Sequence, residues 1–416
     1  MQQHEQLFLE ALKASLKNEK VLWQEPLSKE IWQQLFELSE VQKVLPLIFN
    51  TVFGCPAAKQ MDSQQFADMR RRTVGQMMNQ IQKTDEFLNL YAKLGSEGVK
   101  PLVVKGIVCR ELYPNPDLRL SSDEDLLVSD TAFEKSANLL NAYGMKQRNS
   151  QEILENVDEI GFISEKGVSY IELHKHLFPE SSDAYGNLNQ YFSECFEKCV
   201  SINVQGTIIY TMEPGMHLFY LICHAFKHFL GSGFGIRQVC DITMFANTYG
   251  KQINWQELLG QCREIRADIF AAAIFRIGKN HLIFDEEKAA YPKEWRNIEI
   301  DETDMLLELL DSGIYGSASK SRLHSSNMTL EAVAAQKRGK KEINTVITSI
   351  FPSAVNLENR YTYLKKRPYL LPAAWLERML KYWQEIQKTK NGNVIDAVKI
   401  GNQRIELLKK YGILEK

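Results

Sequence analysis

Residues 119–128 read Arg-Leu-Ser-Ser-Asp-Glu-Asp-Leu-Leu-Val, and this stretch decides which fold we expect. Its second half is a short apolar run of the kind found in buried β-strands. Side chains at positions i and i+2 of a strand lie on the same face, about 6.6 Å apart along the chain. Asp123 and Asp125 therefore share one face of a strand expected at residues 123–128, whereas Glu124 lies on the other face.

The two carboxylates need a cation nearby to stabilise them. On one face of a mostly apolar strand they repel each other and lose hydration. Mg²⁺ prefers one or two carboxylates together with phosphate oxygens, and two such ions can hold the attacking and leaving oxygens of an in-line displacement. The alternative is that both acids lie at a strand edge in water, as in many Asp-x-Asp pairs. We predict Asp123 and Asp125 as Mg²⁺ ligands, with two ions expected.

Two neighbouring segments favour the metal site. Upstream, an apolar run ends in Lys105-Gly106 before a helical turn. Glycine lets backbone N–H groups approach a phosphate closely, and the lysine adds a positive charge. Downstream, residues 168–173 resemble a strand. Glu172 lies on its inward face, and His174, just after the strand, shares that face. We expect Glu172 to bind metal or to take a proton from the attacking group, and His174 to touch acceptor or phosphate.

The remaining pattern predicts an α+β fold. Residues 96–212 combine short apolar runs with a helix at 131–143, which suits a small mixed sheet with helices packed on it. Residues 1–95 and 213–416 carry apolar side chains at helical spacing and are expected to flank this core as two helical regions. The polar stretch 313–345 is expected to be a flexible loop. Further strands are expected at residues 101–105, 145–149, 160–164 and 206–211.

Composition and net charge indicate which classes of partner and which compartment to expect. The 416 residues include 50 Lys and Arg against 52 Asp and Glu, so the net charge of −2 provides no general attraction for nucleic acid. We do not expect a long nucleic acid as a partner. The 7 cysteines form no Cys-x-x-Cys pair, which predicts free thiols in a reducing compartment. No signal peptide and no apolar run of about 20 residues is present, so we expect a cytoplasmic protein without a membrane partner.

Taken together, these segments resemble one family. The chain is similar to the uncharacterised nucleotidyltransferases of the polymerase-β-like superfamily over approximately residues 30–380. The resemblance rests on Val103-Val-Lys105-Gly106, Leu112-Tyr-Pro114, the segment Arg119–Val128, Ile171-Glu172-Leu-His174, His217, His224-Ala-x-Lys227-His228, Arg237-x-x-x-Asp241-Ile, Phe351-Pro352, Arg360-Tyr-x-Tyr363 and Arg367–Trp375.

The resemblance implies a nucleotidyltransferase core with three acids on adjacent strands. Asp123 and Asp125 would hold Mg²⁺, and Glu172 would be the third acid. An acceptor hydroxyl would attack the α-phosphorus of a nucleoside triphosphate (NTP), for example ATP, and release pyrophosphate. The acceptor could be a small molecule, a protein side chain or an RNA end. A binding protein without turnover is one alternative, because Glu124 and Ile107 depart from the family pattern. A toxin-like enzyme acting on tRNA is another, because Lys105-Gly106 is similar to toxin-type members.

Each of the other polar residues has two alternative roles. Arg119 and Ser121 either reach the triphosphate or anchor the loop before the strand. Arg237 either meets a phosphate or forms a helix ion pair with Asp241, four residues on. His224 and His228 have the spacing of a zinc pair but no evident third ligand, so packing or substrate contact is the other reading.

Overall fold

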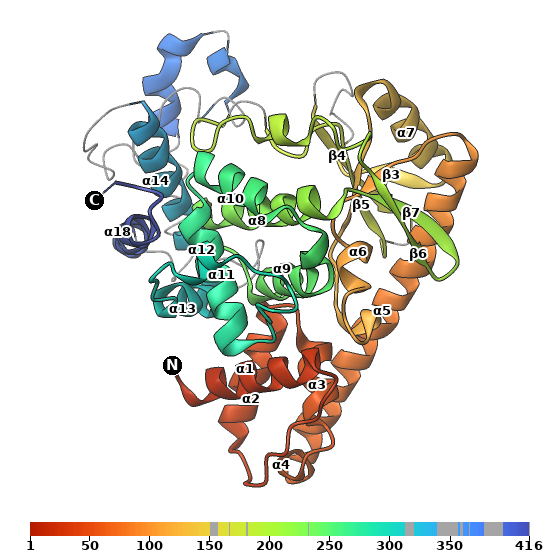
Figure 1. The fold of residues 1–416 in the computed structure, drawn as a ribbon, viewed down its shortest axis with the longest axis vertical. Coiled ribbons are helices and arrows are strands. Elements are labelled where there is room, and N and C mark those ends of the chain that lie inside the picture. Colours follow the sequence, from red (N-terminus) through yellow and green to blue (C-terminus); the bar gives the residue numbers. More distant parts are fainter. Residues whose placement is uncertain are drawn as a thin grey trace.

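The chain forms one mixed β-sheet flanked by helices, which confirms the predicted α+β class (Figure 1). The computed structural model describes residues 1–149, 157–165, 167–179, 182–231, 233–312, 320–338, 357, 361–365, 367–377 and 394–415. Parts of the expected family-like tail, Phe351-Pro352 and Arg360, lie outside these residues. None of the described helices combines the length and apolar character that crossing a bilayer requires. All seven cysteines are free thiols.

The sheet has seven strands in the order β3-β4-β5-β2-β1-β7-β6. Two neighbouring pairs, β2 with β5 and β1 with β7, run parallel, and the other pairs are antiparallel. The strands are β1 (Leu102–Val103), β2 (Glu124–Leu127), β3 (Met145–Gln147), β4 (Glu159–Ser164), β5 (Tyr170–His174), β6 (Val200–Val204) and β7 (Thr207–Thr211).

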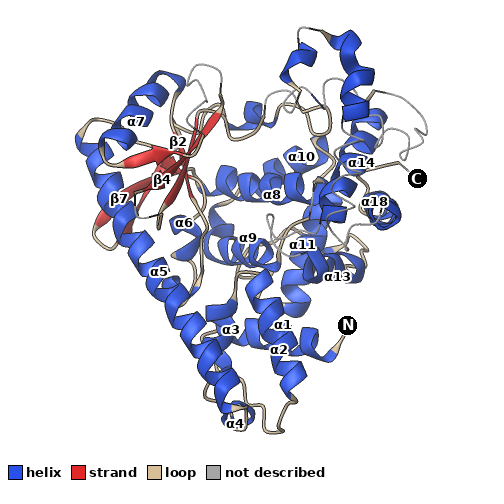
Figure 2. Ribbon diagram, turned by 180° about the vertical axis from the view of Figure 1, so that it is seen from behind, coloured by secondary structure: helices blue, strands red, loops and turns tan. Residues whose placement is uncertain are grey.

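Helices cover both faces of the sheet. The 34-residue helix α5 (Ser63–Ser96) runs from the N-terminal helices to the outer face of the sheet, where α7 (Asp130–Ala142) also packs (Figures 1 and 2). Leu126 and Leu173 point to that side and join the core formed with α5 and α7. Leu127, one residue on from Leu126, points to the other side and joins the larger helical core. The strands therefore alternate between two buried faces.

The larger core is built by helices from both ends of the chain. The N-terminal set comprises α1 (Gln3–Leu16), α2 (Lys29–Val41), α3 (Leu45–Val52) and α4 (Pro56–Lys59), and the short helix α6 (Ile107–Arg110) follows β1. The C-terminal set comprises α8 (Pro214–Leu230), α9 (Ile236–Tyr249), α10 (Trp255–Glu264), α11 (Asp268–His281), α12 (Lys293–Arg296), α13 (Thr303–Ser312), α14 (Lys320–Lys337) and α18 (Val394–Lys410). The division into regions 1–95, 96–212 and 213–416 stays a prediction.

One local expectation is wrong. Within the polar stretch 313–345, residues 320–337 form helix α14 rather than a loop. Two polar residues of this helix, Ser325 and Thr329, are fully buried. Polar residues at buried positions interrupt the apolar spacing by which a helix is predicted from sequence. α14 packs closely against α18, since a β-carbon on Gly401 would lie 2.4 Å from the sulfur of Met328. Small and polar residues thus allow the two helices to approach.

Candidate active site

Asp125 of β2 and Glu172 of β5 lie opposite each other in the parallel pairing of these strands. Neighbouring strands are about 4.8 Å apart, so side chains that share a rung and a face lie close together. Both carboxylates point to the face opposite Leu126 and Leu173, toward α8. Asp125 is fully buried, whereas Glu172 is half-buried. The two predicted acids are therefore brought together by strand register.

Two basic side chains hold Asp125 in its ionised form. Its Oδ1 lies 3.1 Å from Nζ of Lys105 and 3.2 Å from Nε2 of His174. Burial alone would raise the pKa of Asp125, but the charge of Lys105 and the hydrogen bond from His174 outweigh it and lower the pKa to about 2. Burial opposes the protonation of His174, yet Asp125 raises its pKa.

Glu172 has the opposite electrostatic environment. Burial, together with the negative charges of Asp125 and Asp123, raises its pKa to about 7. Its Oε2 lies 3.7 Å from Nε2 of His174, too far for a hydrogen bond to the ring. A carboxylate with a pKa near neutrality is suited to accept a proton during a reaction.

The free oxygen of Asp125 suits a divalent cation. Oδ2 is buried and accepts no hydrogen bond from any residue that the structure describes. Asp125, Glu172 and His174 offer ligand atoms that all lie within 4.8 Å of one another. Among the described residues this is the group found with metal-ligand geometry, so the alternative of zinc at His224 and His228 gains no third ligand. Hard carboxylate oxygens favour Mg²⁺ or Mn²⁺ over softer ions.

Asp123 lies just before β2 and is half-buried. It falls outside the compact group of three, although we predicted it as a metal ligand beside Asp125. Its charge nevertheless acts on Lys105 and Glu172. It borders a cavity that is also lined by Lys105, Gly106, His224, Arg237 and Gln238. A metal role for Asp123 stays a prediction.

The outward-facing acid of β2 is neutralised. Glu124 is buried and pairs with Arg110, whose Nη1 lies 2.5 Å from Oε1. Its Oε2 accepts the N–H of Ile107 at 2.7 Å. Gly106, just before that N–H, has a φ of +54°, and a β-carbon there would lie 1.9 Å from Oε2 of Glu124. The glycine turn is therefore closed by Glu124, and the Ile107 N–H is not available to a phosphate.

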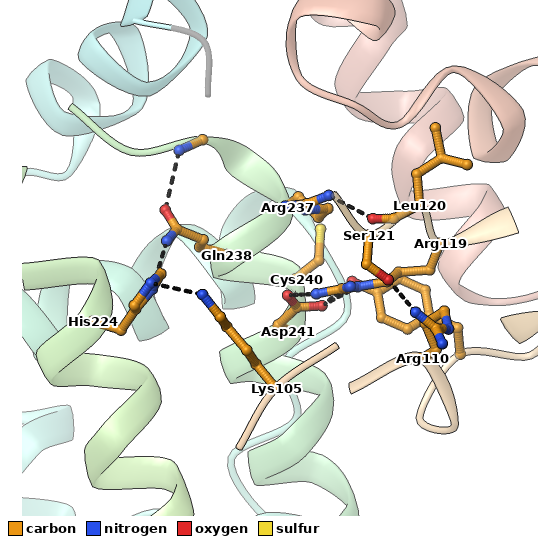
Figure 3. Close-up of polar contacts among 12 residues, drawn as sticks. Lys105, Arg110, Arg119, Leu120, Ser121, His224, Arg237, Gln238, Cys240 and Asp241 are labelled. Atoms are coloured by element: carbon orange, nitrogen blue, oxygen red, sulfur yellow. Dashed lines mark hydrogen bonds and ion pairs between the residues drawn. The ribbon is translucent and has the colours of Figure 1, made fainter. Parts of the chain in front are cut away.

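Arg119 and Ser121 anchor the loop that precedes β2 (Figure 3). The guanidinium of Arg119 binds both oxygens of Asp241, at 3.1 and 2.5 Å. The hydroxyl of Ser121 lies between Arg110 and Glu124. Both contacts agree with the second of the two expected roles, in which Arg119 and Ser121 anchor the loop.

Arg237 does not form the alternative ion pair with Asp241, which is taken by Arg119. Its Nη1 donates to the carbonyl oxygen of Leu120 at 2.5 Å (Figure 3). Its Nε is buried and donates to no described residue. Burial and the nearby charge of Arg119 lower the pKa of Arg237. A buried guanidinium with an unused N–H at the cavity wall is suited to an anion.

Helices α8 and α9 add polar residues beside Lys105, namely His224, for which substrate contact was one of the alternatives, and Gln238, which sequence reasoning did not assign to the site. Nε2 of His224 lies 3.2 Å from Nζ of Lys105, and its Nδ1 lies 3.0 Å from the side-chain amide of Gln238 (Figure 3). Burial and the charge of Lys105 keep the pKa of His224 well below its usual value. Lys227, one turn on, has its Nζ 6.0 Å from the ring of Phe178, and no described carboxylate lies within ion-pair distance. Burial lowers its pKa, whereas Glu159 opposes that shift.

The match to one family model agrees with the sequence pattern. A family model described as "Uncharacterised nucleotidyltransferase" matches residues 28–282, which is more than half of the chain but ends before the tail included in the expected resemblance. The crystal structure of an antigenic nucleotidyltransferase-like protein from Paracoccidioides brasiliensis is similar over 48% of this chain and 93% of that chain, with 15% identity and a TM-score of 0.30. No curated protein matches.

Proposed function

Because the chain belongs to the uncharacterised nucleotidyltransferase family, we propose that it transfers a nucleoside monophosphate from an NTP to an acceptor hydroxyl and releases pyrophosphate. One observation carries this proposal. The ionised Asp125 and Glu172, whose pKa is raised to about 7, share a rung of the sheet, and no described residue donates to the buried Oδ2 of Asp125. This combination suits a metal-bound triphosphate better than a structural ion pair, which would satisfy both oxygens.

Asp125 and Glu172 would hold Mg²⁺, with Asp123 beside them and His174 in contact with Asp125. The bound ions would supply charge stabilisation for the attacking and leaving oxygens of the displacement. Lys105 and His174 fix Oδ1 of Asp125, so its Oδ2 is presented to the metal in a constant orientation. Preorganisation of this kind reduces the reorganisation needed during the reaction.

Three cations near the acids would bind the triphosphate. Arg237 lines the cavity beside Gly106, and its unused Nε–H can donate to a phosphate oxygen. Lys105 would approach the phosphates from the opposite wall of the same cavity. Lys227 lies on α8 and forms no ion pair with a described carboxylate, so its ammonium group can bind a phosphate. Positioning and charge stabilisation supply most of the rate gain in such transfers.

Glu172 would take the proton of the acceptor hydroxyl. The hydroxyl oxygen then forms a bond to the α-phosphorus, and the bond to pyrophosphate breaks as pyrophosphate leaves with its electron pair. In the metal-free protein, burial and the negative charges of Asp125 and Asp123 raise the pKa of Glu172 to about 7, so its carboxylate has a higher proton affinity than that of an ordinary glutamate. A protein that binds nucleotide without turnover has no need of such a group.

Incubation with α-labelled ATP, GTP, CTP and UTP in Mg²⁺ and a small-molecule extract tests the proposal, with transfer of the label to an acceptor and release of unlabelled pyrophosphate both measured. We expect release with at least one nucleotide and a loss of about a thousandfold in Asp125→Asn. Glu134→Gln, a change at an exposed acid of α7, is the control and should match the wild type. Binding of nucleotide without release, unchanged in Asp125→Asn, would favour the binding-protein alternative.

A further inference from the structure

We infer, on the basis of the proposed function, that the cavity bordered by Lys105 and Arg237 receives the terminal phosphate of the NTP, and that the ring of His224 donates its Nε2–H to this phosphate. The cavity has a volume of about 50 Å³ and is also lined by Gly106 and Gln238. A water needs roughly 10–15 Å³ of such space, so the cavity has room for about four waters. One phosphate group brings a similar number of oxygens, whereas a nucleoside, with its base and sugar, does not fit.

The side-chain amide of Gln238 has a defined orientation. Its Oε1 accepts the N–H of Gly235 at 3.3 Å, just before α9 begins (Figure 3). A backbone N–H can only donate, so the oxygen of the amide faces Gly235 and the NH₂ group faces His224. Nε2 of Gln238 lies 3.0 Å from Nδ1 of His224 and therefore donates to it.

This hydrogen bond fixes the tautomer of His224. Because Nδ1 accepts, the neutral ring carries its proton on Nε2. Burial and the positive charge of Lys105 hold the pKa of His224 well below its usual value, so the ring gains no second proton near neutral pH. His224 is therefore a hydrogen-bond donor at Nε2 that carries no charge of its own.

The Nε2–H of His224 faces a second donor. The ammonium group of Lys105 lies 3.2 Å from Nε2, and an ammonium has no lone pair with which to accept a hydrogen bond. Nε2 of His228, also 3.2 Å away, is the acceptor within reach among the described residues, and this distance is at the upper end of the usual range. A phosphate oxygen beside Lys105 and His224 would accept from both of these groups, which cannot bond to each other.

The position of His224 identifies the phosphate. Lys105 lies between His224 and the metal acids, since its Nζ is 3.1 Å from Oδ1 of Asp125 and 3.2 Å from Nε2 of His224. A phosphate bound to a metal at Asp125 would contact Lys105, and His224 would contact a phosphate further along the triphosphate. Because the cavity has room for one phosphate, that group is the last one.

The charges at the wall of the cavity favour an anion. Arg237 forms no ion pair with a described carboxylate, because Asp241 is bound by Arg119. The other acid at the wall is Asp123, which we predict to bind metal. A diphosphate held at the metal by its first phosphate would leave Arg237 and His224 without a partner. A site with unpaired polar groups discriminates against such a ligand, so the chain should prefer NTP to NDP.

Nucleotides with three and two phosphates test the assignment. Calorimetric titration of the full chain in Mg²⁺ compares non-hydrolysable analogues of ATP, GTP, CTP and UTP with the four matching NDPs. We expect the best NTP to bind roughly tenfold tighter than its NDP, or more, and His224→Met to reduce this ratio by about fivefold or more. His224→Gln should keep the ratio within about twofold, because its amide N–H can replace the Nε2–H. His4→Met, at a half-buried histidine of α1, is the control and should leave the ratio unchanged.

Gln238 is a positioning residue, and its effect on the tautomer can be observed directly. In a ¹H–¹⁵N spectrum of the histidine ring nitrogens, the signals of His224 are those that disappear in His224→Gln. We expect a proton on Nε2 and none on Nδ1. Gln238→Met should lose the fixed tautomer and also reduce the preference for NTP. A merely structural role of Gln238 would leave the tautomer of His224 as it is.

Several results would overturn the assignment. These are a proton on Nδ1 of His224, equal binding of NTP and NDP, or an unchanged ratio in His224→Met. Failure of the proposed function gives a different result, in which NTP binds with the full preference and no label reaches an acceptor, and the phosphate site then stands. Label transfer by a chain that binds NDP as tightly as NTP would overturn the terminal-phosphate site alone. Absence of nucleotide binding would overturn both.

Discussion

Oε2 of Glu124 occupies the space that a side chain on Gly106 would need. The turn that carries Lys105 into the site is thus shaped by an acid on the opposite face of β2. Glu124 accepts the Ile107 N–H and pairs with Arg110, so the charge that departs from the family pattern is stabilised within the fold. The charge of Glu124 is therefore no longer a reason to prefer a binding protein without turnover.

Replacing Gly106 by alanine should destabilise the protein. The residue has a φ of +54°, where a side chain is strained, and the new β-carbon would meet Glu124. We expect a loss of about 2–4 kcal/mol in the free energy of unfolding, measured by urea denaturation. Gly95→Ala is the matched control, because Gly95 lies in α5 with open space around it and should gain up to about 1 kcal/mol. Equal effects of the two changes would contradict this account of the turn.

Replacing Glu124 by glutamine should be more costly than its size suggests. The amide keeps the shape of the side chain but leaves the buried Arg110 without a counter-charge. Breaking a buried pair costs about 3–5 kcal/mol, which thermal unfolding would detect. Glu111→Gln, at an exposed position just after α6, should change stability by less than about 0.5 kcal/mol. A second change, Arg110→Met, should recover part of the loss. If it adds a further full loss instead, the two side chains are not coupled.

Replacing Lys227 by methionine should weaken nucleotide binding without weakening the fold. The lysine ammonium is half-buried with no described ion-pair partner, so its removal breaks no ion pair within the described part of the chain. A lost charged contact to phosphate is worth about 1.5–3 kcal/mol, or roughly 10- to 100-fold in Kd. Calorimetric titration with Mg²⁺ and a non-hydrolysable NTP would measure it, with the exposed Lys146→Met as control. An unchanged Kd would exclude Lys227 from the nucleotide site.

The metal-free protein should lose stability as the pH rises through the range in which Glu172 titrates. Its pKa is raised from 4.5 to about 7, so between these values the folded state binds more protons than the unfolded state, and stability falls with rising pH. The raised pKa of His174 acts in the same direction above its ordinary value of 6.5. We expect urea denaturation to show a decrease of about 1–2 kcal/mol between pH 5 and pH 7 that is smaller in Glu172→Gln.

Mg²⁺ should reverse this trend, because it binds the ionised carboxylate. Its stabilising effect should therefore grow as the pH rises over the same window. An equal effect of Mg²⁺ at pH 5 and pH 7.5 would show that Glu172 does not bind the metal.

The strand pattern made part of the site predictable. Alternation with a period of two places Asp125 on the inner face of β2 and Glu172 on the same face as His174, and this needs no knowledge of the rest of the chain. The α+β class followed from the same change of pattern, from helical spacing to short apolar runs. Strand β6 escaped notice because its residues are mostly exposed, so no apolar alternation marks it.

The remaining partners could not be predicted because they are distant in sequence. Arg110 reaches Glu124 across 14 positions, and His224 reaches Lys105 across 119. No local periodicity encodes such contacts, which depend on how α6 and α8 pack against the sheet. The pairing of Asp241 with Arg119 shows the same limit, since the four-residue spacing offered Arg237 as the partner of Asp241 and gave no sign of Arg119.

Anomalous scattering from crystals soaked with Mn²⁺ and a non-hydrolysable NTP tests the central claim most directly. We predict a manganese peak within about 2.5 Å of Oδ2 of Asp125 and of a carboxylate oxygen of Glu172, together with triphosphate density between Lys105 and Arg237. A nucleotide bound elsewhere, or a rung between β2 and β5 that holds neither metal nor phosphate, would contradict the account.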